Sequence, residues 1–450
     1  MAPAILDGTI LRSHILTICQ GIDLSYRVDP LGLIFAITSS FLWILVSCYS
    51  IGYMRALNEH AQTRYYFMFA LAIFSAVSIA FSENLITFYI FYEALTLSTY
   101  WLVAHHEDQE ALAGARKYLS YLLLSGWFLF AAVVLTYSIA GTTEFRNGGI
   151  LSVASAPEAT LMILFLLFAL GSMKAAWMPF HSWLPSAMVA PTPVSSLLHA
   201  VAVVKAGVFG FVRIVCHVYG IDLMRDLGLG LMLGSAASFT MIVASLFAIG
   251  EDNLKRRLAY STISQLSYIL FGVALLTASG IKGAIVHIPF HGFMKITLFL
   301  CAGAIMVMTG KKQISRLGGV AKQMPVTMAA FTIGALGMCG VPPVAGFVSK
   351  WFLCLGTVES GYFIFLGVIL ISSLLDVIYF FPIVKAAYFE KADIGNGEQI
   401  VNREKGRPIY MFMVIPLAIT GFFSLLFCFF PRMFYILDLA ELTVGKIMGK

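Results

Sequence analysis

Charge is scarce in this 450-residue sequence: 12% of the residues are Asp, Glu, Lys or Arg, whereas 60% are hydrophobic. Soluble globular domains are typically about one quarter charged. The composition therefore excludes an ordinary soluble domain. It also leaves a net charge of +6, which must be explained by where the few basic residues lie.

The sequence also lacks the motifs of cofactor and nucleotide chemistry. Its seven cysteines form no CxxC pair and no metal-ligand spacing, which argues against an iron–sulfur or haem site in the chain. It contains no Walker motif and no GxGxxG after a strand, so ATP-driven pumping and nucleotide-dependent redox chemistry find no support. We expect no cofactor, no metal and no redox or hydrolytic centre in this chain.

What the sequence does contain is apolar runs of about twenty residues, each long enough to cross a hydrocarbon core of about 30 Å. They recur from Leu31 to Phe430. We predict an all-α polytopic protein of the lipid bilayer with about twelve transmembrane helices. The predicted spans are residues 30–53, 64–82, 84–104, 117–140, 159–180, 193–219, 227–250, 258–279, 283–309, 324–357, 361–389 and 408–434. The tenth contains "CGVPPVAG" and is predicted to be a broken helix.

The predicted organisation has three parts: a short extramembrane N-terminus at 1–29, a membrane domain at 30–435 and a C-terminal tail at 436–450. The first 28 residues lack the uninterrupted apolar core of a cleavable signal peptide, so the first span is expected to direct insertion. Lys and Arg gather in the loops of one side, which the positive-inside rule places in the cytoplasm, with both termini outside the cell membrane. This asymmetry explains the net charge without a nucleic-acid partner.

Several ionisable side chains lie deep in the predicted spans, where each costs about 2.5–3.5 kcal/mol or more at the bilayer centre. A merely structural polar contact could be made by Ser or Thr at a lower desolvation cost. We therefore treat the deep set as candidate proton-translocation residues. They are Glu93, Lys174, Lys205, His199, His287, His291, Lys295 and Lys350, with Asp376 and His181 as further candidates.

Glu93 and Lys174 carry opposite charges at similar depths on two predicted helices, so we predict that they approach each other. Desolvation opposes the charged form of a buried lysine. A carboxylate at about 4 Å counteracts this by roughly 4 kcal/mol at an effective dielectric constant near 20. A contact that forms and parts could therefore load and unload the lysine with a proton. The alternatives are an acid that hydrogen-bonds a neighbouring helix and a lysine that snorkels to the interface.

Lys205 follows His199 by six residues, which corresponds to about 240° around a helix. The two side chains therefore leave different faces and would exchange a proton only through water. A buried, hydrogen-bonded histidine is the alternative for His199.

His287, His291 and Lys295 are spaced i, i+4, i+8 and would share one helix face, loosened by Pro289. Two histidines at this spacing can also bind zinc. No acidic residue accompanies them in the span, which favours a protonatable chain over a metal site.

Two segments pair a lysine with a proline break: "KAAWMPFHSWLP", which contains Lys174, and "CGVPPVAGFVSK", which contains Lys350. Corresponding breaks in two halves suggest internal repeats with a transport path between them. For Lys350 the alternative is a snorkelling end residue. His181 could lie at the edge of the path or cap a turn, and for Asp376 packing and function are equally open.

Four blocks in this order resemble the antiporter-like subunits shared by respiratory complex I, Mrp-type cation/proton antiporters and membrane-bound hydrogenases. They are "KAAWMPFHSWLPSAMVAPTPVSSLLHAVAVVKAG", "KRRLAYSTISQLSYIL", "HIPFHGFMKITLFLCAGAI" and "GVPPVAGFVSKWFL". The resemblance runs from about Asp29 to about Ala387. It implies a proton-translocating subunit with two inverted repeats, roughly 64–219 and 227–389, each holding a half-channel.

The resemblance also implies roles. The family's early acid falls on Glu93 and the lysine that it pairs with on Lys174, while the exit-side residue falls on Lys350. The central lysine falls on Lys205, and the connecting residues fall on His199, His287, His291 and Lys295. Retaining both His199 and Lys205 is more similar to Mrp and hydrogenase-type members.

The sequence departs from the family in three ways. Members usually begin with two further helices before the "DPLGLIFA" region, whereas only a short polar stretch precedes it here. No long lateral helix follows the last span, and Asp376 stands where a neutral residue is common.

Three classes of function remain. The leading one is a proton-translocating membrane subunit of a larger ion-pumping complex, which works with other membrane subunits. The second is a stand-alone Na⁺/H⁺ antiporter, although sodium favours clustered oxygen ligands and the deep set is mostly lysine and histidine. The third is a membrane scaffold that anchors an enzymatic partner. The driving reaction does not follow from this sequence.

Overall fold

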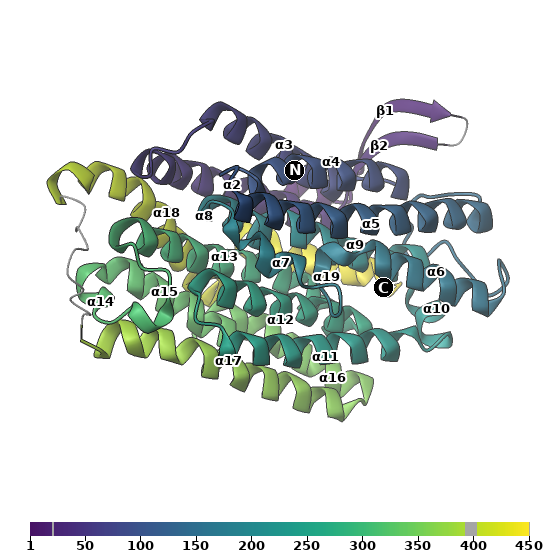
Figure 1. Ribbon diagram of the computed structural model, residues 1–450. Coiled ribbons are helices and arrows are strands. Elements are labelled where there is room, and N and C mark those ends of the chain that lie inside the picture. The colour runs from purple at the N-terminus through teal and green to yellow at the C-terminus, as the bar shows by residue number, and fades with distance from the viewer. Residues whose placement is uncertain (20–21, 392–402, 450) are drawn as a thin grey trace.

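The computed structural model describes residues 1–19, 22–391 and 403–449 and shows a bundle whose long helices run roughly parallel to one another (Figure 1). Large apolar side chains are exposed on the flanks of the bundle, including Trp127, Ile364 and Phe389 at 74%, 78% and 81% exposure. A soluble monomer rarely leaves contiguous apolar patches of this kind in water. The flanks therefore fit a lipid environment, as the composition predicts.

The N-terminal part contains the feature that the all-helical prediction did not include. After the short helix α1 (Ala2–Leu6), the strands β1 (Leu11–Cys19) and β2 (Ile22–Val28) form an antiparallel hairpin that projects from the bundle (Figure 1). Leu11 pairs with Val28 and Ser13 with Tyr26. The hydroxyl of Tyr26 donates to Ser78 Oγ at 2.8 Å, which ties the hairpin to the helices.

The first half of the bundle runs from Pro30 to Asp226. Its helices are α2 (Pro30–Ala56), α3 (Gln62–Phe81), α4 (Leu85–Val103), α5 (Gln109–Ala140), α6 (Glu158–Gly171), α7 (Trp183–Ser186), α8 (Thr192–Ser196), α9 (Val203–Arg213) and α10 (Ile221–Asp226). Helix starts coincide with capping side chains: Asn84 accepts from the Thr87 amide at 2.8 Å, and Asp108 accepts from the Ala111 amide at 2.7 Å. Such caps satisfy amide groups that have no partner within the helix.

The second half begins at Leu229. Its helices are α11 (Leu229–Gly250), α12 (Leu254–Ala274), α13 (Ala278–Thr309), α14 (Val320–Gln323), α15 (Pro325–Cys339), α16 (Ala345–Ser360), α17 (Phe363–Phe389), α18 (Arg403–Phe429) and α19 (Ile436–Ile447). Helix α19 packs against α2 and α13, so the stretch expected to be a tail is largely a helix of the bundle.

The helices account for the predicted membrane crossings. Within the described residues, eight segments are long and apolar enough to cross a bilayer: 30–56, 62–81, 109–140, 192–219, 229–250, 278–309, 363–389 and 410–429. Helices α4 and α12 fill the predicted positions at 84–104 and 258–279. The remaining two predicted crossings, the fifth and the tenth, are interrupted.

Both interruptions place a lysine beside non-helical backbone. The tenth predicted span consists of α15 and α16, separated at residues 340–344, and Lys350 lies in the first turns of α16. In the fifth, α6 ends at Gly171, and a short 3₁₀ turn (Met173–Ala175) carries Lys174. The prolines of both segments remove amide donors that a continuous helix would need.

The centre of the bundle is the stretch Thr192–Tyr219, in which every residue is buried. It contains α8, α9 and two π-helical segments, Leu197–Val201 and Ile214–Tyr219. Helix α13, which is also largely buried, packs against this stretch. A helix that is apolar on all sides belongs inside a protein, and the surrounding helices shield the polar side chains of this central stretch from the protein surface.

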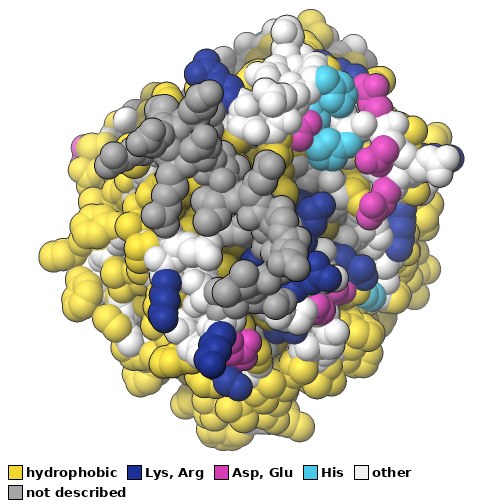
Figure 2. Space-filling model, turned by 60° about the vertical axis from the view of Figure 1, so that its left-hand side comes forward, with side chains coloured by type: hydrophobic (Ala, Val, Ile, Leu, Met, Phe, Trp, Pro, Cys, Tyr) yellow, Lys and Arg dark blue, Asp and Glu magenta, His cyan; other side chains and the backbone are white. Residues whose placement is uncertain are grey.

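Charged side chains gather at the end of the bundle that lies on the left in Figure 1. Figure 2 views this end and shows blue, magenta and cyan groups on it, most of them in the right half of the view, with yellow hydrophobic side chains along the rim. The lysines of this end include Lys117, Lys255, Lys311 and Lys312. It is the end where the sequence concentrates its basic loops.

Candidate functional site

Glu93 and Lys174 meet inside the first half of the bundle. Glu93 lies on α4, and Lys174 lies on the 3₁₀ turn that follows α6. Lys174 Nζ is 4.0 Å from Glu93 Oε1, so the predicted approach is observed. The lysine side chain is fully buried, and the glutamate side chain is 18% exposed. At this separation the charges attract without a direct hydrogen bond.

Lys174 donates hydrogen bonds to neutral groups instead. Its ammonium donates to the Tyr92 carbonyl at 2.9 Å and to Thr96 Oγ1 at 2.7 Å. The same nitrogen lies 3.3 Å from the centre of the Tyr92 ring, a cation–π distance. Glu93 Oε1, by contrast, is buried and has no hydrogen-bond partner. Hydrogen bonds therefore fix the position of the Lys174 ammonium, whereas no hydrogen bond fixes the Glu93 carboxylate.

Two glycines make this arrangement sterically feasible. A Cβ at Gly126 of α5 would lie 2.4 Å from Glu93 Oε1. A Cβ at Gly207 of α9 would lie 2.3 Å from the Ala175 amide nitrogen, beside Lys174. Such distances are shorter than non-bonded contacts allow, so both glycines let neighbouring helices close over the pair.

Lys205 pairs with a histidine of another helix. Its Nζ lies 2.5 Å from His291 Nδ1, and both side chains are buried. The sequence indicated that Lys205 and His199 leave different faces, and the direct partner observed is His291 from α13. A neutral imidazole has one nitrogen that can accept a hydrogen bond from an ammonium group. This lysine can therefore be held without a carboxylate partner.

The histidines of α13 form a short row. The rings of His287 and His291 stack at a centroid distance of 5.7 Å, and Ser349 Oγ lies 2.8 Å from His287 Nδ1. The Nε2 atoms of both histidines are buried without hydrogen-bond partners. Among the described residues, the one group of three or more donors within metal-binding reach lies elsewhere, so the zinc alternative for this pair gains no support.

His199 lies in the π-helical segment of the central stretch. Its ring packs on Phe299 with centroids 4.6 Å apart, and neither ring nitrogen has a hydrogen-bond partner. A buried polar group without a partner is costly, and the alternative of a hydrogen-bonded histidine is not what the structure shows. Its role in proton movement stays a prediction.

Lys295 leads from α13 into the second half. Its ammonium donates to Ser261 Oγ at 2.8 Å and lies 3.4 Å from the Leu258 carbonyl. The Tyr379 hydroxyl lies 2.8 Å from Ser261 Oγ and 2.6 Å from Asp376 Oδ1. Hydroxyl groups thus link Lys295 to Asp376.

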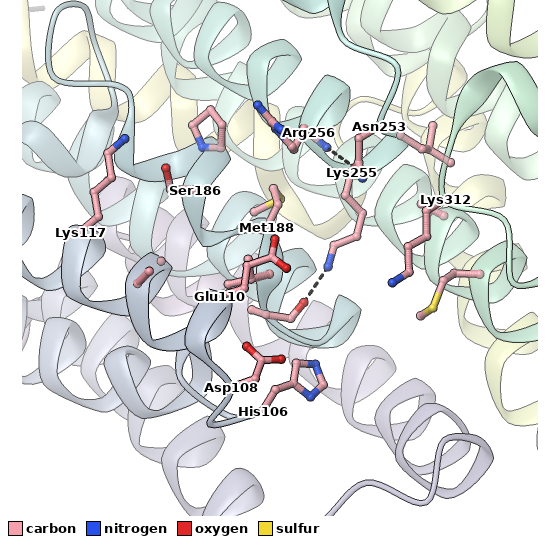
Figure 3. Close-up of a pocket in the computed structure, with 18 of the residues that line it drawn as sticks. His106, Asp108, Glu110, Lys117, Ser186, Met188, Asn253, Lys255, Arg256 and Lys312 are labelled. Carbon is pink, nitrogen blue, oxygen red and sulfur yellow. Dashed lines mark hydrogen bonds between the residues drawn. The ribbon is translucent and has the colours of Figure 1, made fainter.

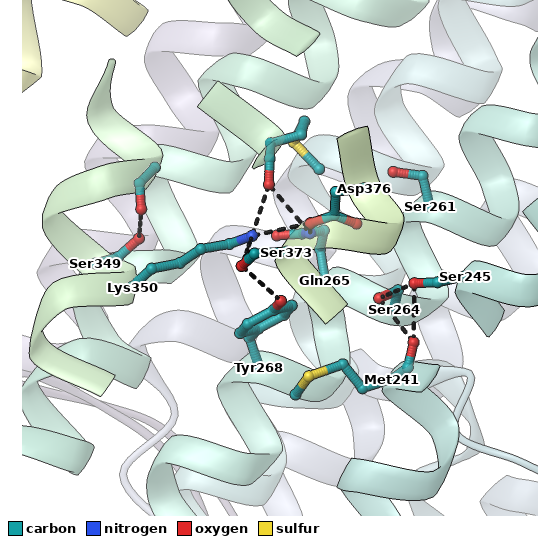
Figure 4. A network of polar contacts seen from close by, with 12 residues as sticks. Met241, Ser245, Ser261, Ser264, Gln265, Tyr268, Ser349, Lys350, Ser373 and Asp376 are labelled. Carbon is teal, nitrogen blue, oxygen red and sulfur yellow. Dashed lines mark hydrogen bonds and ion pairs between the residues drawn. The ribbon is translucent and has the colours of Figure 1, made fainter. Parts of the chain in front are cut away.

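Asp376 and Lys350 form a direct ion pair. Figure 4 shows Lys350 reaching from its helix toward Asp376, with Ser373 and Tyr268 close by. Lys350 Nζ lies 2.9 Å from Asp376 Oδ2, and Gln265 Nε2 donates to the same oxygen at 2.8 Å. Asp376 is fully buried, so this pair is shielded from solvent.

The structure therefore gives Asp376 the partner that the sequence left open. Lys350 also donates to the Met338 carbonyl at 2.8 Å and to Ser373 Oγ at 3.1 Å. With these acceptors inside the bundle, Lys350 does not snorkel to the interface.

His181 is half-buried and lies apart from the deep set. Its ring stacks against Phe247 with centroids 6.2 Å apart, and its Nδ1 has no hydrogen-bond partner. The adjacent residue Ser182 donates to the Tyr121 hydroxyl at 2.9 Å and lines a pocket at the charged end. His181 thus lies near the edge of that pocket.

The pocket at the charged end has a volume of about 810 Å³. Figure 3 shows Lys117, Lys255 and Lys312 along its walls, with Asp108 and His106 below. Lys255 donates to the Ala190 carbonyl at 2.6 Å. The pocket hollows the charged end, and Ser182, Pro185 and Ser186, which follow the interruption after Lys174, form part of its lining.

The structure contains another buried ion pair, between Arg213 and Asp29, which the sequence did not indicate. Arg213 donates to both carboxylate oxygens of Asp29, at 2.5 and 2.8 Å, and its side chain is 1% exposed. Asp29 also caps α2 by accepting from the Gly32 amide at 2.8 Å. Arg213 lies eight residues after Lys205 in the central stretch, a spacing that could have drawn attention to it.

Two family models match the sequence. The family model described as "NADH:quinone oxidoreductase/Mrp antiporter, TM" matches residues 82–376. The model described as "NADH-Ubiquinone oxidoreductase (complex I), chain 5 N-terminus" matches residues 20–66. Together they cover most of the bundle.

Two curated relatives illustrate the range of matches. The chain is 32% identical over 367 residues to NADH-quinone oxidoreductase subunit N of Desulforudis audaxviator (strain MP104C), which covers 81% of this chain and 72% of the relative. It is 31% identical over 346 residues to hydrogenase-4 component B of Escherichia coli (strain K12). That match covers 73% of this chain but 50% of the relative.

The fold resembles a chain in the structure of the Mrp complex from Dietzia sp. DQ12-45-1b. The TM-score is 0.85 at 22% sequence identity, and the superposition covers 99% of this chain and 88% of the other. At this level of identity the likeness concerns the fold.

Proposed function

Because the chain belongs to the NADH:quinone oxidoreductase/Mrp antiporter transmembrane family, we propose that it is a proton-translocating membrane subunit of a larger ion-pumping complex. Its partners are then other membrane subunits, as the names of its relatives suggest. The single observation that carries the proposal is the set of buried lysines, each with a proton-exchanging group or a hydrogen-bonded chain beside it.

We assign the loading step to Glu93 and Lys174. A buried lysine binds a proton more readily when a carboxylate is near. At 4.0 Å, the attraction is about 4 kcal/mol for an effective dielectric constant near 20. Because no hydrogen bond joins the two groups, a small displacement of α4 or of the 3₁₀ turn would change this attraction. Lys174 would then gain or release its proton.

We assign transfer to the central residues. His291 shares a proton with Lys205, and the stacked ring of His287 extends this row toward Ser349. The hydroxyl groups of Ser261 and Tyr379 can each accept one proton and donate another. They connect Lys295 to Asp376 and so to Lys350 at the far side of the second half.

The geometry favours protons over sodium. Sodium needs several oxygen ligands around one point. The oxygens of Asp376, Ser373 and Met338 do converge, but the ammonium of Lys350 already lies among them. A sodium ion would have to displace that charge, so a stand-alone Na⁺/H⁺ antiporter is the weaker interpretation.

We also propose the orientation that the positive-inside rule predicts. The charged end with its pocket faces the cytoplasm, and the opposite end, which carries the hairpin, lies outside the cytoplasmic membrane. A cysteine placed at Lys312 should resist a membrane-impermeant maleimide in intact cells, whereas one at Arg146 should react. The reverse pattern would overturn the orientation.

The function is tested by proton flux in vesicles that contain the assembled complex. Glu93→Gln and Lys174→Ala should each reduce proton translocation at least about tenfold, as expected for loss of an interaction worth more than 1.4 kcal/mol, while the complex stays assembled on a native gel. Glu158→Gln and Lys322→Ala change exposed residues of the same types and should leave the flux unchanged. A scaffold predicts normal flux in all four variants.

A further inference from the structure

Three side chains capable of binding a metal converge at the charged end, and a fourth, His106, lies beside Glu59; all four are outside the lysine and histidine set described above. Glu59 and His60 lie in the loop between α2 and α3, and His105 and His106 follow α4. One ligand atom from each of Glu59, His60 and His105 lies within 4.8 Å of the others. Glu59 Oε2 is also 3.6 Å from His105 Nε2 and 3.5 Å from His106 Nδ1.

His105 supplies a second, independent observation. Its side chain is fully buried, yet neither ring nitrogen has a hydrogen-bond partner. The ring stacks on His60 at a centroid distance of 5.0 Å and meets Tyr65 edge-on at 5.5 Å. Leaving a buried polar group without a partner is costly, so these nitrogens call for a ligand that the protein itself does not provide.

The backbone holds the two loops in an unusual conformation around the cluster. Asn58, Ala61 and Glu107 have φ values of 50°, 47° and 58°, in the left-handed region that residues other than glycine seldom adopt. Arg64 donates to Glu107 Oε1 at 2.5 Å and to the His105 carbonyl at 3.4 Å. Arg64, at the start of α3, thus ties this helix to the segment that follows α4 through contacts that do not use the ligand side chains.

We propose that Glu59, His60, His105 and His106 form a site for a transition-metal ion of the zinc class that links the α2–α3 loop to the end of α4. Tetrahedral zinc with bonds of about 2.0–2.1 Å places its ligand atoms roughly 3.3 Å apart. The Glu59–histidine distances of 3.5 and 3.6 Å are close to that value. Imidazole ligands suit zinc, copper or nickel, whereas magnesium and calcium prefer oxygen.

The charge of the site is compatible with a cation. Glu59 is the acidic ligand of the set, and its Oε2 lies 3.6 and 3.5 Å from ring nitrogens of His105 and His106. Asp108 and Glu110 line the same pocket as His106, and Figure 3 shows Asp108 next to this histidine. A carboxylate of the pocket lining therefore lies close to the proposed site.

The test is metal binding by the purified full chain in its complex, prepared without a histidine tag. Equilibrium dialysis against Zn²⁺, followed by metal quantification, should give one tightly bound ion per chain. The double variant His60→Ala/His106→Ala should weaken this binding at least tenfold, and Glu59→Gln should do the same. His14→Ala, which removes an exposed histidine from the hairpin at the other end, should bind like the wild type.

A second readout needs no knowledge of the binding constant. Ligand binding to the folded state alone raises its stability, so Zn²⁺ should raise the melting temperature of the wild type and of His14→Ala but not of the double variant. His105 is not substituted, because its ring is packed in the core. Absence of a bound ion in the wild type, or equal binding by wild type and double variant, would overturn the proposal. Neither readout depends on proton flux, so failure here is distinguishable from failure of the proposed function.

Discussion

The two buried lysine–carboxylate pairs differ in how closely their charges are held. In the second half, Lys350 touches Asp376 at 2.9 Å, and Gln265 and Tyr379 add hydrogen bonds of 2.8 and 2.6 Å to that carboxylate. In the first half, Lys174 stands 4.0 Å from Glu93, whose Oε1 has no hydrogen-bond partner. The same pair of charge types is thus built once as a closed network and once as an open contact.

This difference assigns different work to the two pairs. Three donors surround the Asp376 carboxylate, so its position beside Lys350 is fixed. Glu93 lacks such donors, and its attraction to Lys174 depends on distance alone. We propose that the first pair exchanges a proton during turnover, whereas the second stays in close contact.

The largest stability effect should come from breaking the closed network. Asp376→Asn leaves Lys350 as an uncompensated buried charge, which typically costs about 3–5 kcal/mol. The variant should show a marked fall in melting temperature in detergent. Glu93→Gln should produce less than half of that fall, because it removes no hydrogen bond to Lys174. Equal falls in the two variants would contradict the distinction between the pairs.

A smaller effect is expected when the network loses one bond. Tyr379→Phe removes the hydroxyl that joins Ser261 to Asp376, and a hydrogen bond to a charged group is worth about 1.5–3 kcal/mol. Melting temperature and proton flux should both fall. Tyr388→Phe, a change of the same type at a more exposed position of the same helix, is the control and should change neither. Normal flux in Tyr379→Phe would exclude this hydroxyl from the path.

The smallest of the three stability effects should come from crowding the open pair. Gly126→Ala places a methyl group 2.4 Å from Glu93 Oε1, and overpacking typically costs about 1–3 kcal/mol. Displacement of the Glu93 carboxylate should clearly lower proton flux, while the melting temperature should fall only slightly. Gly367→Ala is the matched control, since a Cβ at Gly367 meets nothing within 4 Å. Equal flux in the two alanine variants would show that the position of Glu93 is unimportant.

Much of the fold could be predicted from the sequence, because apolar runs and proline breaks are local signals. Each of the predicted crossings has a counterpart, and the break before Lys350 lies where "CGVPPVAG" indicated. The N-terminal hairpin was missed because its strands interleave polar residues such as Arg12, His14 and Asp23 with apolar ones, so they form no continuous apolar run. Helix α19 was missed because its twelve residues are too few to span a bilayer.

The deep charges could also be found from the sequence, but most of their partners could not. The approach of Glu93 to Lys174 was predictable from opposite charge at similar depth. The contacts of Lys205 with His291 and of Lys350 with Asp376 join different helices, and no spacing rule connects such positions. The convergence of His60 with His105 has the same origin, since two loops 45 residues apart meet only after the helices have packed.

The central claim is that the Glu93–Lys174 pair exchanges a proton during turnover, and infrared difference spectroscopy of the purified complex tests it directly. Spectra recorded between acidic and alkaline pH should contain a band from a protonated carboxyl group. This band should be absent in Glu93→Gln and retained in the exposed-residue control Glu158→Gln. A band that persists unchanged in Glu93→Gln would contradict the assignment of the open pair as the site of proton loading.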